Sequence, residues 1–102
     1  MTKEEIKQIY LNKGIEYTEY WSSNKEFNGS YVCCVVLKIN NQRIAEYGLH
    51  SQYTPFSKEQ KDSLLNNYHS NLDEMAINLG YKSFDNFVDY LKNKYFGTNI
   101  DN

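Results

Sequence analysis

The sequence is poor in residues that break or cross-link a chain, and it has no long apolar run. Its 102 residues include one proline, five glycines and two cysteines. No apolar stretch approaches the roughly twenty residues that a membrane-spanning helix needs, and the start, Met1 to Glu5, leads into no hydrophobic signal core. We therefore expect no membrane segment, reduced cysteines and a cytoplasmic location.

An excess of one charge is also missing. Eleven basic and thirteen acidic side chains give a net charge of −2, spread evenly along the chain. Nucleic-acid binders usually carry a basic stripe, so nucleic acid is not the expected partner. Ten lysines, one arginine and thirteen asparagines are typical of an AT-rich coding genome, which favours a bacterium, its phage or a mobile element as the source.

Aromatic residues, by contrast, are plentiful: ten tyrosines, five phenylalanines and one tryptophan. They are enough to fill a core, and the chain has the length of a single domain. We predict one domain over residues 1–97 and a flexible C-terminal tail over residues 98–102.

Hydrophobic periodicity predicts a helix over residues 3–13, three strands over 15–21, 31–39 and 43–50, a helical segment over 58–79 and a last helix capped by Ser83. Asn28-Gly29 and Asn40 to Gln42 mark the turns between strands. The helix-poor residues 66–71 leave open whether the long helix is broken. The predicted fold class is α+β, with a short three-stranded antiparallel sheet, an N-terminal helix and two or three C-terminal helices packed on one face (α-β-β-β-α-α).

Residues capable of catalysis or metal binding are few and scattered. Cys33 and Cys34 are neighbours in a predicted strand, so their side chains point to opposite faces. His50 and His69 lie far apart without an acidic cluster. We predict no enzyme, no metal and no cofactor. One alternative stays open: in the expected strand pairing Cys34 lies diagonally from His50, which would suit a small thiol-dependent enzyme.

Part of the C-terminal half resembles a known motif. Met75-Ala76, Gly80-Tyr81, Ser83, Phe87, Leu91-Lys92 and Phe96-Gly97 are similar to the second helix-turn-helix of AraC-type regulators. The resemblance covers some 23 residues and implies DNA binding. The would-be recognition helix carries Asp85 and Asp89, which have the wrong sign for phosphates, and it lacks the arginines that read guanine. DNA binding is therefore an alternative reading.

The sheet region holds more aromatic residues than one covered face can take, and exposed Tyr and Trp are typical of protein-binding surfaces. We expect anchors and acidic steering residues at Tyr20, Trp21, Phe27, Tyr53, Glu16, Glu19 and Glu26. The leading hypothesis is a non-enzymatic domain that binds another protein with a basic surface. It would be an inhibitor or immunity protein of a bacterial or phage conflict system, such as an anti-CRISPR or toxin-immunity protein. A homo-oligomer is left open.

Overall fold

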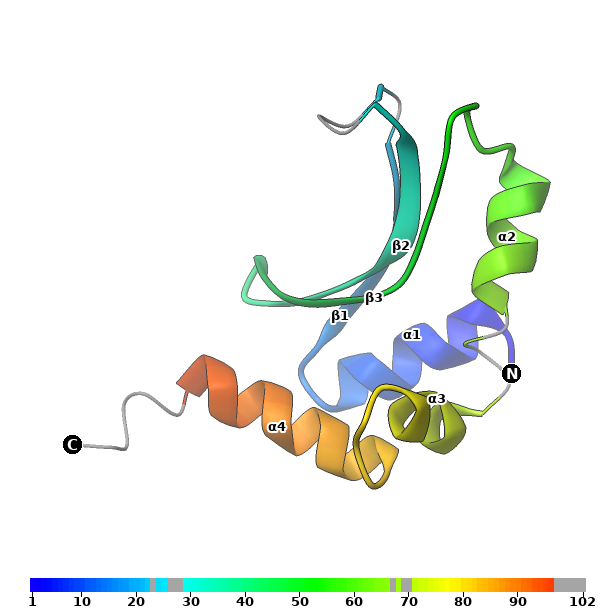
Figure 1. Ribbon diagram of the computed structural model, residues 1–102. Coiled ribbons are helices and arrows are strands. Elements are labelled where there is room, and N and C mark those ends of the chain that lie inside the picture. The colour runs from blue at the N-terminus through cyan, green and yellow to red at the C-terminus, as the bar shows by residue number, and fades with distance from the viewer. Residues whose placement is uncertain (23, 26–28, 67, 69–70, 97–102) are drawn as a thin grey trace.

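A computed structural model describes residues 1–22, 24–25, 29–66, 68 and 71–96. Their order is helix, three strands, then three helices, which confirms the predicted α+β class (Figure 1). The predicted turn residue Asn28 and the predicted tail over 98–102 lie outside the described residues. The elements are α1 (Lys3–Asn12), β1 (Glu16–Trp21), β2 (Tyr31–Ile39), β3 (Gln42–Gln52), α2 (Lys58–Asn66), α3 (Leu72–Asn78) and α4 (Phe84–Phe96).

The sheet is an antiparallel meander in the order β1-β2-β3. Asn40 and Asn41 join β2 to β3 with positive φ angles of 50° and 65°, as a two-residue hairpin turn requires. This turn places Val35 opposite Tyr47, the predicted pair. Because β2 lies between two partners, β1 and β3 are the edge strands.

Two irregularities in β3 bend the sheet. Between the pairs Cys33–His50 and Val35–Tyr47, β3 contains one residue more than β2, and Gly48 there has a φ of +68°. A side chain at position 48 would come within 2.9 Å of the Tyr68 ring. Glycine suits this position because it tolerates the positive φ angle and because it leaves room for that ring. A second shift follows Leu37. Figure 1 shows the resulting strong curvature of β2 and β3.

All the helices lie on the convex side of this curved sheet (Figure 1). The core therefore forms between that side of the sheet and the helices, and it includes Ile6, Tyr10, Tyr17, Val35, Leu37, Tyr47, Leu65, Met75, Phe84, Phe87 and Leu91. Inside it the hydroxyl groups of Tyr10 and Tyr47 share a hydrogen bond of 3.0 Å. Burial raises the pKa of both phenols, so they remain protonated donors and acceptors at neutral pH.

Local signals set the helix ends. Thr2 and Glu5 form the predicted capping box at α1. Ser57 accepts from the Gln60 amide, but the Gln60 side chain bonds to Gln52 instead of completing a second box.

The long helical segment is divided into α2, which ends at Asn66, and α3, which begins at Leu72. The Asn71 side chain caps α3 by accepting from the Glu74 amide. Short polar side chains that bond to nearby backbone favour such caps over a helix interior. Ser83 caps α4 as predicted, accepting from the Asn86 amide. Among the described residues, no helix combines the length and the apolar character that crossing a bilayer demands.

Candidate protein-binding surface

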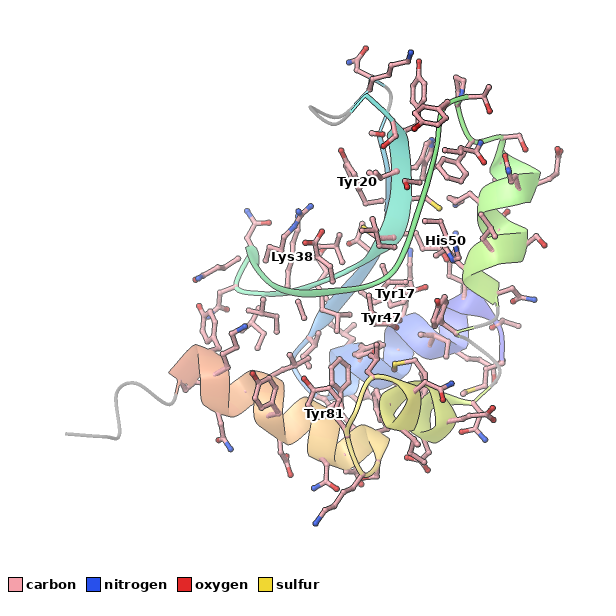
Figure 2. The ribbon with its side chains drawn as sticks, in the orientation of Figure 1. Tyr17, Tyr20, Lys38, Tyr47, His50 and Tyr81 are labelled. Carbon is pink, nitrogen blue, oxygen red and sulfur yellow. The ribbon has the colours of Figure 1, made fainter. Side chains whose placement is uncertain are left out.

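The concave side of the sheet, which we call the open face, has no helix packed on it. Figure 2 shows Tyr20 and Lys38 on this side, whereas Tyr17, Tyr47 and His50 point toward the helices. Strand alternation and register assign the following side chains to the open face: Glu16, Thr18, Tyr20, Val32, Cys34, Val36, Lys38, Arg43, Glu46, Leu49 and Ser51.

Side chains, rather than a helix, cover the middle of the open face. Cys34 and Val36 are each only 1% exposed. The Arg43 guanidinium reaches across from β3 and lies 5.8 Å from the centre of the Tyr20 ring on β1. It is held by the Glu46 carboxylate at 3.2 Å. The central strand is therefore covered, on this side, by an aromatic–arginine pair.

Two large side chains flank that covered centre. Tyr20 pairs with Cys34 from the β1 side and is 37% exposed, and Leu49 lies beside Cys34 on the β3 side and is 67% exposed. Tyr20 was predicted as an anchor, whereas Leu49 was missed because the Gly48 bulge sets its direction. Because exposed aromatic side chains are enriched at protein interfaces, the open face is the candidate contact surface.

The cysteines do not form the proposed thiol–imidazole pair. The bulge places His50 opposite Cys33 on the helix side, so Cys34 and His50 lie on different faces and the predicted diagonal contact is wrong. The Cys34 thiol lies 3.8 Å from the Glu46 carboxylate instead. Burial, with the nearby Glu46 charge, raises the pKa of Cys34 to about 11, and burial also raises that of Cys33. Thiols of this kind are poor nucleophiles at neutral pH.

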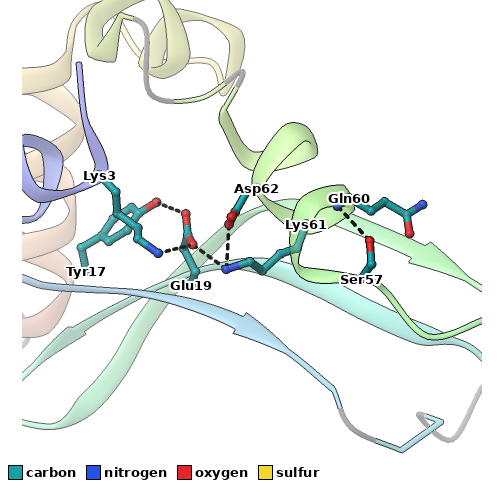
Figure 3. A network of polar contacts seen from close by, with 7 residues as sticks. All are labelled: Lys3, Tyr17, Glu19, Ser57, Gln60, Lys61 and Asp62. Carbon is teal, nitrogen blue, oxygen red and sulfur yellow. Dashed lines mark hydrogen bonds and ion pairs between the residues drawn. The ribbon is translucent and has the colours of Figure 1, made fainter.

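Trp21 and Glu19 point the other way. Glu19 belongs to an ionic network between β1, α1 and α2 (Figure 3). The Lys61 ammonium is 2% exposed and lies 3.0 Å from the Glu19 carboxylate. It sits 4.3 Å from the centre of the Trp21 ring. Lys3 binds the same Glu19 oxygen at 3.1 Å, and the Tyr17 hydroxyl donates to the other. The network ties both helices to the sheet.

The protonation of this network is settled by its hydrogen bonds. Burial by itself would raise the pKa of Glu19, but hydrogen bonds from Lys61 and Lys3 outweigh it and lower that pKa. Burial would lower the pKa of Lys61, and its bonds to Glu19 and Asp62 raise it instead. Both groups are therefore charged at neutral pH and satisfy each other, which marks a structural pair.

The remaining predicted contact residues are not gathered in one place. Glu16 is exposed on the open face, and Tyr53, just after β3, is 80% exposed. Trp21 is 46% exposed beside α2, away from Tyr20. Phe27 and Glu26 lie outside the described residues.

The segment that resembles a helix-turn-helix forms α3 and α4. Phe84, Phe87, Val88 and Leu91 turn one side of α4 into the core. Asp85 and Asp89 are exposed on α4, and Asp85 pairs with Lys13 at 3.2 Å. The accessible side of the first two turns of the would-be recognition helix thus carries carboxylates, which repel phosphates.

No three or more His, Cys, Asp or Glu residues in the described part of the chain are grouped so that they could hold a metal ion. Comparison with known proteins finds no matching family model, no matching curated protein and no matching solved structure.

Proposed function

We propose that this chain is a non-enzymatic protein-binding domain whose contact surface is the open face, centred on Tyr20 and Leu49. The observation that supports this most strongly is the exposure of two large side chains, 37% and 67%, on a sheet face to which no helix packs. Interfaces concentrate their binding energy in a few large residues near their centre, which the surrounding contacts shield from water.

The surface is suited to binding because little has to be ordered when a partner arrives. Tyr20 is already held by Arg43, and Arg43 by Glu46. Side chains fixed before binding lose less conformational entropy on association. The flanking strands also fix the positions of both anchors, which a loop would not.

The charges of the open face guide the choice of partner. Glu16 is exposed at one rim, opposite Lys38 in the register of β1 and β2. Glu19 is engaged by Lys3 and Lys61 and so does not steer a partner. We propose a partner that places an apolar residue between Tyr20 and Leu49 and a cation near Glu16, in keeping with the basic surface that the sequence favours.

We further propose that binding serves inhibition or immunity in a bacterial or phage conflict system. The support for this class is the small size, the slight acidity and the AT-rich composition of the chain. A domain of this kind acts by covering a working surface of its target, so it needs contact area and no reactive group of its own.

The experiment is capture of a partner from the source organism by Leu49→Asp, Tyr20→Ala and the unchanged chain. Leu11→Asp is the matched control, because Leu11 on α1 is 61% exposed, close to the value for Leu49. Loss of a hot-spot contact costs about 2 kcal/mol or more, so both open-face variants should retain at least about tenfold less partner. Equal retention by all four chains would refute this contact surface.

A further inference from the structure

A second surface lies between β3 and α4, and we call it the β3–α4 groove. It consists of two adjoining hollows of about 570 and 280 Å³. Both are lined by Ile44 and Lys94. Figure 1 shows α4 beneath the hairpin formed by β2 and β3. The groove lies on the helix side of this hairpin, and its lining shares Arg43 and Glu46 with the open face.

One wall of the groove is the free edge of a strand. Among the described residues, β3 pairs only with β2, and no backbone–backbone hydrogen bond from another element reaches it. An unpaired edge offers a row of backbone donors and acceptors that an extended segment can bind.

The opposite wall is aromatic. Tyr81 and Tyr90 line one hollow, with ring centres 5.3 Å apart. Tyr95 and Phe96 line the other, with ring centres 4.7 Å apart. Tyr90 is 48% exposed and Phe96 is 45% exposed. Two hollows with aromatic side chains along one strand edge suit alternate side chains of a bound strand, which point the same way.

The charge of the groove selects the occupant. Among the described residues, Arg43 and Lys94 are the charged residues that line the larger hollow, and Lys94 and Glu46 are those that line the smaller one. Arg43 is engaged by Glu46 and Tyr20. Lys94, which both hollows share, is exposed and has no carboxylate partner among the described residues. A carboxylate at this junction would gain a charge-assisted hydrogen bond.

We propose that the β3–α4 groove binds an extended acidic segment of a partner protein as a fourth strand on β3. An apolar side chain of the segment enters the hollow beside Tyr81 and Tyr90, and a Glu side chain two positions along the segment meets Lys94. The backbone of the segment pairs with the outer edge of β3. This proposal does not depend on the function assigned to the open face.

The test is an NMR titration of the full chain with the blocked peptide acetyl-Thr-Val-Thr-Leu-Thr-Glu-Thr-amide. Short peptides that add a strand bind weakly, with a Kd of about 1 mM. We expect shifts of the backbone amides of Arg43 to Glu46 and of Tyr81, Tyr90 and Lys94. Lys94→Glu should weaken binding by at least about fivefold, the effect of roughly 1 kcal/mol, and a peptide with Lys in place of Glu should restore it.

Two further measurements separate strand addition from other contacts. Peptides methylated on the backbone nitrogen of either odd or even positions should differ sharply, because only one set of N–H groups faces β3. Leu49→Asp should leave peptide binding unchanged, since it lies on the open face. Equal binding of both methylated peptides would overturn the proposal. So would concentration-dependent shifts of the same amides without peptide, since these would assign the groove to a second copy of the chain.

Discussion

The two faces of the sheet use the same strands for different purposes. On the helix side, Tyr17, Leu37 and Tyr47 are buried against α1, α3 and α4 in a continuous core. On the open face, the strand residues Cys34 and Val36 are just as buried, and there the cover consists of strand side chains, among them Tyr20, Arg43 and Glu46. The comparison teaches that one sheet can bury both of its faces by different means, with packed helices on one side and with its own side chains on the other.

The largest effect should follow from a change on the helix side. Leu37 is fully buried, and Leu37→Ala should lower the free energy of unfolding by about 2–5 kcal/mol, through lost burial and the cavity left behind. Leu49→Ala on the open face should change it by no more than about 0.5 kcal/mol. Denaturant unfolding of the two variants measures both values. Similar losses of unfolding free energy in the two variants would mean that Leu37 on the helix side stabilises the fold no more than Leu49 on the open face.

The bulge at Gly48, beyond which the side chains of β3 change faces, should be almost as sensitive to substitution. Gly48→Ala and Gly14→Ala both place alanine at positive φ, 68° and 82°, at a cost of about 1–2 kcal/mol each. Only at Gly48 does the new methyl group meet a neighbour, the Tyr68 ring at 2.9 Å, and overpacking should add about 1–3 kcal/mol. Thermal unfolding compares the two. The added cost at position 48 should vanish in a Tyr68→Ala background.

The ionic network on the helix side should show a smaller effect that depends on pH. Glu19→Gln leaves Lys61 without its buried partner and should cost about 1–3 kcal/mol at neutral pH. The folded chain lowers the pKa of Glu19 below its ordinary value of 4.5. The stabilisation is therefore complete above that value and is lost as the pH falls below it. Unfolding at neutral pH and near pH 3, where free Glu is protonated, should show the difference between the two chains shrinking. A constant difference would contradict the ion pair.

The smallest effect on stability should come from the side-chain cover. Tyr20→Ala removes a cation–π contact of about 0.5–1 kcal/mol and exposes the thiol that Tyr20 faces, Cys34. Alkylation followed by mass spectrometry should show Cys34 reacting several times faster, with Cys33 on the helix side unchanged. Tyr53→Ala is the control, because Tyr53 is 80% exposed and follows the strand. Equal rates for Cys34 in all three chains would show that Tyr20 does not shield it.

Much of the fold could be predicted because the local signals agree with one another. The apolar run over 31–39, the Asn40-Asn41 turn and the capping residues Thr2 and Ser83 each fix an element without help from distant residues. The break between α2 and α3 was left open, since helix-poor residues only weaken a helix and the Asn71 cap depends on the chain turning there.

The surface was harder to predict because it depends on register. The extra residue at Gly48 reverses the faces to which the following side chains of β3 point. A prediction from regular alternation therefore places His50 on the wrong face and does not find Leu49 on the open face. The sequence predicts Glu19 as an exposed charge, whereas in the structure Lys61 and Lys3 both form ion pairs with it. One available signal was missed: Lys61 lies four residues before the buried Leu65, on the inward side of α2, where a lysine needs a buried partner.

The most direct test of the account is hydroxyl-radical footprinting of the full chain with and without its captured partner. Binding through the open face predicts that oxidation of Tyr20 and Leu49 falls several-fold in the complex, while oxidation of Leu11 on α1 stays the same. All three side chains are at least 37% exposed in the free chain, so each gives a measurable signal. Protection of Leu11, with Tyr20 and Leu49 reacting as before, would contradict the assignment of the contact surface.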